Sequence, residues 1–354
     1  MTQPPEKSLD RKLRRILADP ACGDFILADA KDADMAFGLA APGLAAGGSP
    51  GTGPFRSIHA FRDNIRELVA DGLVDIMLMS ASTSEALTID EQLFAASPVT
   101  PAVRMNDTTD IWLAAGTGGY AREPALPFAT TTIPQARWGR ADPLGPGAGP
   151  GVNLGLFSIT LNDSASLDRD MLLAYREFRL AAERAGFQHF LEVFYPNAPG
   201  HVAGKPAGSR PTDIARFLAD HVVRALAGVP RAGRPLFLKI PYLGPAVMEQ
   251  LASYDRSLIV GVLGGSAGTT HDAFDLVADA KRHGARVALF GRKINAAEHQ
   301  PTFVRHLRLV ADGDLVADEA VRAYHAALAG LGIRPHRLLA DDLIRNPSAA
   351  AYGG

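Results

Sequence analysis

The stretch from residue 258 to residue 292 reads LIVGVLGGSAGTTHDAFDLVADAKRHGARVALFGR. It contains two apolar runs of strand length, 258–264 and 286–291, separated by a helical pattern over 270–283 that stops at Gly284. Both runs are almost continuously apolar, which is typical of parallel strands covered on both faces. The stretch therefore predicts a strand–helix–strand unit with parallel strands.

Further apolar runs of the same length precede this unit. They lie at 25–30, 74–79, 102–106, 154–160, 189–195 and 236–240, with amphipathic helical patterns at 59–70, 168–185 and 211–227. Together with the two runs above, this makes eight expected strands. Eight strands that alternate with helices predict a (β/α)8 TIM barrel. A doubly wound open sheet is the alternative, but the first strand is followed by no glycine-rich nucleotide-binding fingerprint.

The 354 residues, of which 47% are hydrophobic, are enough for one large domain. We expect a single barrel domain over 1–354, with a capping helix at its N-terminal end and helices appended at its C-terminal end. The expected parts are the capping helix at 5–19, the barrel at 25–311 and the extension at 312–354. Clusters of Gly and Pro at 41–54, 139–151 and 196–210 predict long surface loops.

The composition argues against nucleic-acid-binding, disulfide-rich and membrane-spanning proteins. The formal net charge of −2 provides no basic field for sequence-independent nucleic-acid binding. Cys22 is the single cysteine, so a disulfide framework is excluded. No apolar run reaches the roughly 18 residues of a membrane span, and the charged N-terminus is unlike a signal peptide. We expect a cytoplasmic protein that binds neither nucleic acid nor membrane.

Lys239 is the first candidate catalytic residue. It lies near the C-terminal end of the apolar strand Leu236-Phe237-Leu238-Lys239-Ile240, the end at which barrels place their active sites. Burial there lowers the pKa of an amine, and a neutral amine can attack a carbonyl. The alternative is a structural ion pair between this lysine and a carboxylate inside the barrel.

The last two strands predict an anion site. Strand seven ends in Gly264-Gly265-Ser266, and strand eight ends in Gly291-Arg292. Barrels commonly bind phosphate between these two loops, where glycine allows backbone N–H groups to approach an anion and arginine adds a charged donor. The alternative for a Gly-Gly pair is an ordinary turn.

Four other strand-end residues are candidates. Asp29 ends strand one and can assist the amine, or it can cap a turn. Tyr195 ends strand five and can carry a proton if a nearby ammonium lowers its pKa, or it can be a packed aromatic. Arg104 and Asn106 end strand three on one face and can hold substrate hydroxyls, although a structural ion pair is equally compatible with Arg104.

No metal or cofactor is expected. His189 and Glu192 face opposite ways by strand parity, and no paired-histidine spacing typical of zinc occurs. No P-loop pattern is present.

Taken together, the strand ends resemble the Schiff-base (class I) aldolases that include the deoxyribose-phosphate, tagatose-bisphosphate and archaeal-type fructose-bisphosphate aldolases. The resemblance is closest to the archaeal-type branch. The matching segments are Ala28-Asp29, Val103-Arg104-Met105-Asn106, Tyr195-Pro196, Lys239-Ile240-Pro241-Tyr242-Leu243-Gly244, Gly264-Gly265 and Gly291-Arg292-Lys293-Ile294. The chain departs from that branch at Ala30, where the family has histidine, and at Val193, where it has an aromatic residue.

The resemblance implies a carbon–carbon lyase that acts on a phosphorylated or otherwise anionic carbonyl compound through an imine on Lys239. It also implies that Tyr195 carries the proton during bond cleavage, while Asp29 orients the amine. A homo-oligomer is expected. The alternatives are a metal-assisted lyase or isomerase on the same barrel, and a barrel without catalysis that binds a phosphorylated metabolite.

Overall fold

The computed structural model describes residues 5–45, 53–108, 119, 121–142, 151–199, 213–265 and 268–346. Its parallel strands are β1 (Ile26–Lys31), β2 (Ile76–Met79), β3 (Thr100–Arg104), β6 (Leu154–Thr160), β7 (Gln188–Phe194), β8 (Leu238–Lys239), β9 (Gly261–Leu263) and β10 (Val287–Phe290). They pair in the order β8-β7-β6-β3-β2-β1-β10-β9. Isolated parallel bridges from Phe237 to Ile259 and from Ile240 to Val262 join the two ends of the sheet. The barrel therefore closes, and the predicted (β/α)8 fold is confirmed.

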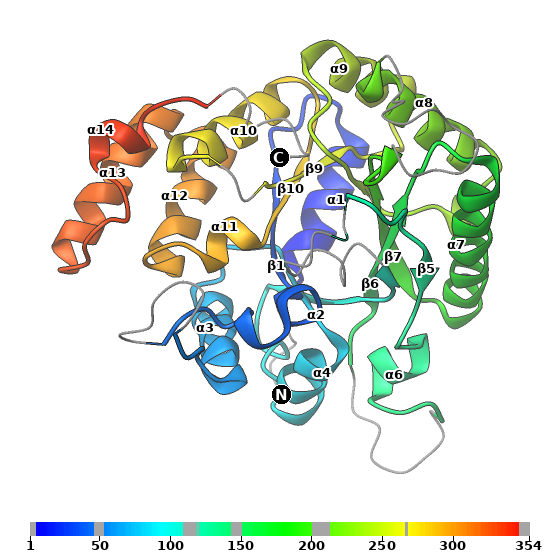
Figure 1. Ribbon diagram of the computed structural model, residues 1–354, viewed down its shortest axis with the longest axis horizontal. Helices are drawn as coiled ribbons and strands as arrows, with labels where there is room; N and C mark the ends of the chain where they lie inside the picture. The colour runs from blue at the N-terminus through cyan, green and yellow to red at the C-terminus, as the bar shows by residue number, and fades with distance from the viewer. Residues whose placement is uncertain are drawn as a thin grey trace.

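Amphipathic helices surround the strands (Figure 1). The longer ones are α3 (Ile58–Asp71), α7 (Ala165–Ala185), α8 (Ile214–Ala227), α9 (Pro245–Tyr254), α10 (Thr270–Arg282) and α12 (Gln300–Asp312). The shorter elements are α2 (Ala33–Phe37), η1 (Gly38–Ala40), α4 (Ala81–Ser84), η2 (Glu85–Asp90), α6 (Ile133–Trp138), η4 (Arg231–Gly233) and α11 (Arg292–Asn295). Outside the barrel sheet, β4 (Asp107–Thr108) and β5 (Pro127–Phe128) form an antiparallel pair.

Side chains alternate between the inside and the outside of the barrel. On β1, Ile26, Ala28 and Ala30 belong to the apolar cluster inside the barrel. Leu27, which lies between the first two, belongs to the larger cluster between strands and helices. This period of two is the geometry of any strand, and it decides which strand-end residues reach the mouth of the barrel.

The N-terminal end of the barrel is closed by α1 (Ser8–Ala18). Leu9 and Leu13 of this helix are buried in the interior cluster. A helix with apolar residues four apart presents them on one face, which here fills the bottom of the barrel. The predicted capping helix is confirmed.

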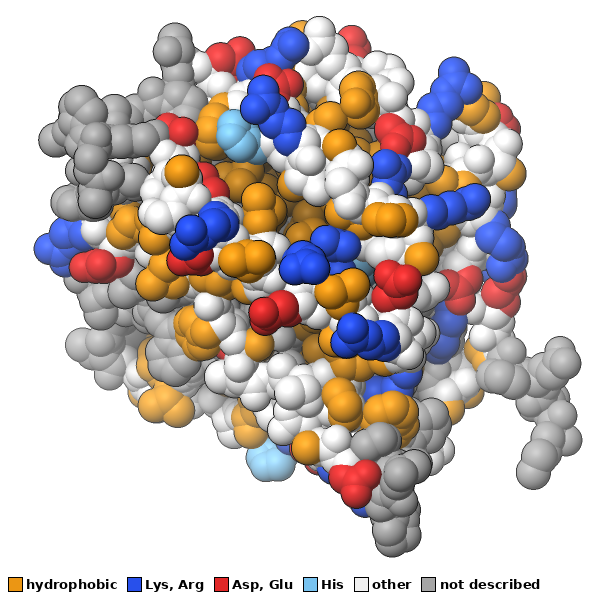
Figure 2. Space-filling model, turned by 90° about the vertical axis from the view of Figure 1, so that its right-hand side faces the viewer, with side chains coloured by type: hydrophobic (Ala, Val, Ile, Leu, Met, Phe, Trp, Pro, Cys, Tyr) orange, Lys and Arg blue, Asp and Glu red, His pale blue; other side chains and the backbone are white. Residues whose placement is uncertain are grey.

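The C-terminal helices α13 (Ala317–Gly330) and α14 (Leu339–Asp342) pack on one side of the barrel (Figure 1). Tyr324 of α13 is buried, and its hydroxyl donates to Glu298 at 2.7 Å. The predicted helical extension is confirmed, although its last helix has only four residues. On the face shown in Figure 2, basic and acidic side chains are interspersed among apolar ones.

Candidate active site

Four neighbouring strands send polar side chains into the mouth of the barrel. Arg104, Ser158, Glu192 and Lys239 lie on β3, β6, β7 and β8. Each lies two residues beyond a member of the interior cluster, so it shares that inward-facing side of its strand. All four are buried. The fold therefore gathers one guanidinium, one hydroxyl, one carboxylate and one ammonium within a closed polar layer.

The centre of this layer is a lysine–glutamate pair. Glu192 and Lys239 are register partners on adjacent parallel strands. The Lys239 Nζ lies 2.5 Å from Oε1 of Glu192, and the two side chains are 8% and 2% exposed. The lysine at this strand end is buried, and the carboxylate directly beside it is the contact that the ion-pair alternative describes.

The second oxygen of Glu192 is also engaged. Its Oε2 accepts hydrogen bonds from the Ser158 hydroxyl at 2.5 Å and from the Arg104 guanidinium at 3.0 Å. Burial opposes ionisation of Glu192, but Lys239, Arg104 and these hydrogen bonds outweigh it and hold the pKa of the carboxyl below its ordinary value. Glu192 is therefore a carboxylate at neutral pH.

A second carboxylate, Asp32, reaches the layer from the segment after β1. Its Oδ2 accepts a hydrogen bond from Nε of Arg104 at 2.6 Å. Burial would raise the pKa of Asp32, but Arg104 and Lys239 outweigh that effect and lower it. The sequence analysis missed this residue. The alternation of side chains along a strand could have identified Asp32, because it lies two residues beyond Ala30, which faces inward as Ala28 does.

Asp29 does not join this layer. It lies on the opposite side of β1 from Ala28 and Ala30, fully buried, with an oxygen 3.2 Å from Nζ of Lys31. Neither of its oxygens has a hydrogen-bond partner among the described residues. Burial raises the pKa of Asp29 to about 6, and the Lys31 ammonium opposes the rise. We expected Asp29 to lie beside Lys239. In the structure it is instead the counter-ion of Lys31.

Tyr195 is likewise not placed with the lysine. Its ring is half-buried and packs against the outer apolar cluster, on the side of β7 that also carries Val193. Burial and the nearby carboxylate of Asp213 raise its pKa to about 12. The phenol therefore has the opposite shift from the one expected of a proton carrier beside a cation.

Arg104 and Asn106 are occupied within the protein. Arg104 bonds Asp32, Ser158 and Glu192, so the ion-pair alternative describes its contacts. Asn106 donates to the Ser158 carbonyl at 2.8 Å and accepts from the Ser158 N–H at 2.7 Å. Arg104 therefore connects the polar side chains of the site, and the amide of Asn106 fixes the backbone of β6 at Ser158.

The two glycine-containing loops lie side by side because β9 pairs with β10. A Cβ on Gly264 would lie 2.2 Å from the Phe290 ring, and one on Gly291 would lie 2.6 Å from the Ala30 carbonyl oxygen. Only glycine fits such close approaches. Gly265 and the exposed Arg292 belong to the same loops, whereas Ser266 lies outside the described residues. Among the described residues, the predicted neighbours at this rim therefore belong to two adjacent loops.

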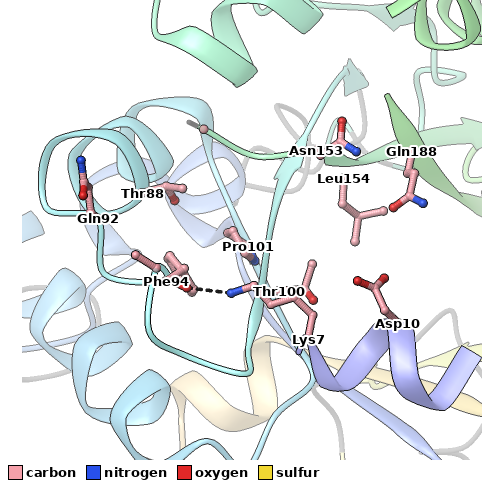
Figure 3. Close-up of a pocket in the computed structure, with 12 residues that line it drawn as sticks. Lys7, Asp10, Thr88, Gln92, Phe94, Thr100, Pro101, Asn153, Leu154 and Gln188 are labelled. Carbon is pink, nitrogen blue, oxygen red and sulfur yellow. Dashed lines mark hydrogen bonds between the residues drawn. The ribbon is translucent and has the colours of Figure 1, made fainter. Parts of the chain in front are cut away.

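A separate pocket lies at the other end of the barrel (Figure 3). It has a volume of about 310 Å³ and is lined by the N-terminal ends of β3, β6 and β7 and by α1. Its Lys7 donates to three backbone carbonyls, including that of Phe94 at 2.7 Å. Lys239 and its partners lie at the opposite strand ends, so they do not line this pocket.

Within the described ranges, no three His, Cys, Asp or Glu side chains are grouped so that they could hold a metal ion. None of the helices in this part of the chain combines the length and apolar character needed to cross a bilayer.

Fold and site together define a (β/α)8 barrel with a lysine–carboxylate cluster at the carboxyl ends of its strands. Among solved structures, an archaeal fructose 1,6-bisphosphate aldolase matches with a TM-score of 0.57 at 15% identity, over 85% of this chain and 99% of that one. The fructose-bisphosphate aldolase from Slackia heliotrinireducens matches with a TM-score of 0.60 at 14% identity, over 92% and 94%. No family model and no curated protein sequence matches the chain. The chain thus has the fold of these aldolases.

Proposed function

We propose that this protein is a class I aldolase, a carbon–carbon lyase that forms an imine between Lys239 and a carbonyl substrate. The observation that carries the proposal is the Lys239 ammonium, buried in the mouth of the barrel 2.5 Å from the Glu192 carboxylate. A lysine with an adjacent proton acceptor is what imine formation requires. An archaeal fructose-1,6-bisphosphate aldolase of the same fold has been captured with its catalytic lysine bound to a carbinolamine intermediate.

The first steps move one proton between the paired residues. Glu192 takes a proton from the Lys239 ammonium, and the resulting amine attacks the substrate carbonyl to give a carbinolamine. Protonated Glu192 then returns that proton to the departing hydroxyl, so that water leaves and an iminium forms. Glu192 ends as a carboxylate, held by Ser158 and Arg104.

The bond-breaking step uses the iminium as an electron sink. A carboxylate removes the proton of the hydroxyl that lies beta to the iminium carbon, the carbon–carbon bond breaks, and its electron pair forms an enamine. Glu192 is the carboxylate paired with the Lys239 nitrogen, and Asp32 keeps Arg104 in place beside it. Protonation of the enamine and addition of water to the iminium release the second product and restore Lys239.

We extend the proposal to the class of substrate, on the basis of the rim formed by the ends of β9 and β10. We assign a phosphate, or another terminal anion such as a sulfonate, to Gly264, Gly265, Gly291 and Arg292, with Ser266 as the fifth expected contact. Adjacent β9 and β10 loops with glycine backbone and an exposed arginine support this assignment. The expected homo-oligomer and cytoplasmic location remain predictions.

The proposal is tested by proton exchange in a keto-phosphate. An enzyme that forms an enamine exchanges a carbon-bound proton next to the carbonyl with solvent, even without an aldehyde partner. The protein is incubated in D2O with a panel of keto-phosphates that includes dihydroxyacetone phosphate, and deuterium uptake is followed by NMR. Uptake that disappears in Lys239→Met supports the proposal. Uptake by no member of the panel, or equal uptake with the variant, contradicts it.

A further inference from the structure

The short helix α11 is fixed to the barrel at alternate residues. It follows β10 directly and begins after Gly291, which approaches the β1 backbone so closely that a Cβ would meet the Ala30 carbonyl oxygen at 2.6 Å. Two further anchors come from buried lysines, one on the helix and one on β1. They have no part in the imine chemistry above.

The first lysine lies on α11 itself. Lys293 is buried, and its Nζ donates to the carbonyl oxygen of Gly268 at 2.7 Å. Gly268 belongs to the segment that connects β9 to α10. This hydrogen bond therefore joins the loop after β9 to the segment after β10. These are the two loops to which the anion site is assigned.

The second lysine reaches α11 from β1. Lys31 is fully buried, and its Nζ donates to Oδ1 of Asn295 at 2.5 Å and to Oε1 of Gln300 at 2.9 Å. Asn295 is the last residue of α11, and Gln300 is the first of α12. Asp29, 3.2 Å away, supplies the opposite charge. The end of α11 is therefore tied to the strand that begins the barrel.

Buried ammonium groups are costly, and apolar residues of similar size often stabilise a fold as well or better. Two such groups nevertheless hold a helix of four residues. Arg292 lies in the sequence between the anchored residues Gly291 and Lys293, and its exposed side chain has no hydrogen bond or ion pair with any described residue. A rigidly held segment that presents an unpaired guanidinium is suited to bind an oxyanion.

We infer that Lys31 and Lys293 are positioning residues, which fix α11 so that Arg292 and the Gly291 backbone meet the phosphate or similar oxyanion of the substrate. Asp29 acts through Lys31 by balancing its charge inside the protein. This inference rests on the proposed function, because it concerns the anion end of the same site.

The test compares inorganic phosphate affinity, by calorimetry, with imine formation. One variant combines Lys31→Met with Asp29→Asn, which removes the buried pair without changing net charge; a second is Lys293→Met. Each is expected to weaken phosphate binding about tenfold, equivalent to about 1.4 kcal/mol. Each also raises KM for a keto-phosphate, while borohydride trapping of unphosphorylated dihydroxyacetone is unchanged. Lys293→Arg, which can still donate to Gly268, restores affinity.

Lys12→Met is the matched control. Lys12 is another largely buried lysine, bonded to the Phe25 carbonyl at 2.9 Å and to Asp75 at 2.8 Å, at the N-terminal end of the barrel. It should lower stability and leave phosphate affinity unchanged. If Arg292→Ala weakens phosphate binding but the folded Lys31 and Lys293 variants do not, the positioning role is overturned and the anion site stands. If Arg292→Ala has no effect, the anion site and this inference both fall, whatever Lys239 does.

Discussion

The Nζ of Lys239 lies 2.5 Å from Oε1 of Glu192, inside a closed barrel and at the carboxyl ends of adjacent strands β7 and β8. The register of the two strands makes these residues direct neighbours, so their pairing follows from the backbone and needs no loop. A nucleophile and its proton acceptor are thus held on rigid elements, which is where precise chemical geometry is easiest to keep.

Replacement of Lys239 by methionine should abolish catalysis and preserve the fold. Methionine fills a similar volume, and Glu192 keeps its hydrogen bonds from Ser158 and Arg104. We expect turnover to fall by at least about 10³-fold, as expected when a nucleophile is removed. Circular dichroism and the melting temperature measure the fold. A folded variant with near-normal turnover would refute the assigned nucleophile.

Glu192→Gln and Tyr195→Phe separate two candidate proton carriers. Glutamine keeps the shape of Glu192 but cannot accept the Lys239 proton, so imine formation and cleavage should slow by about 10²–10⁴-fold. Tyr195 packs in the outer layer, and phenylalanine there should retain activity within about twofold. Single-turnover kinetics measure both. The reverse pattern, with a slow Tyr195→Phe and an active Glu192→Gln, would identify the Tyr195 phenol as the proton carrier instead of Glu192.

Asp29 should make stability depend on pH. Burial raises its pKa in the folded state from 3.8 to about 6, so the folded protein binds the proton more tightly than the unfolded chain. The contribution of Asp29 to stability is therefore present below about pH 4 and is lost as pH rises to about 6. Relative to Asp29→Asn, wild type should lose about 3 kcal/mol across this window. Urea unfolding at several pH values measures the difference, and a constant difference would contradict the shift.

Gly264 should tolerate no side chain. A Cβ there would lie 2.2 Å from the buried Phe290 ring, so Gly264→Ala should cost about 1–3 kcal/mol of stability and weaken phosphate binding. Gly228 is the matched control, because a Cβ added there would have no other atom within 4 Å. Gly228→Ala should stay within about 0.5 kcal/mol of wild type. Denaturant midpoints for both variants provide the comparison, and equal stability would contradict the packing.

The strands were predictable because each is an apolar run bounded by turn residues, and burial on both faces requires such runs. Helices with one clear apolar face, such as α3 and α10, were equally predictable. Short α6 was not, because it lies in a segment rich in loop residues. Its Thr132 and Gln135 form a capping box that marks the start of the helix.

Lys239 was identifiable from its strand end, but its partners depended on strand parity. Asp29 on β1 and Asp32 just after this strand are three residues apart and so face opposite sides of the barrel wall. Only knowledge of where the interior cluster lies decides between them. The same ambiguity affects Tyr195 and Glu192 on β7. A strand buried on both faces gives no alternation of apolar and polar residues from which the inward side could be read.

Borohydride trapping tests the central claim most directly. The full-length protein is mixed with dihydroxyacetone phosphate or another keto-phosphate, reduced, digested and mapped by mass spectrometry. An iminium on Lys239 is reduced to a stable secondary amine, so the account predicts one substrate-sized adduct on the peptide that contains Lys239 and none in Lys239→Met. An adduct on a different lysine, or no adduct across a broad panel with folded protein, would contradict it.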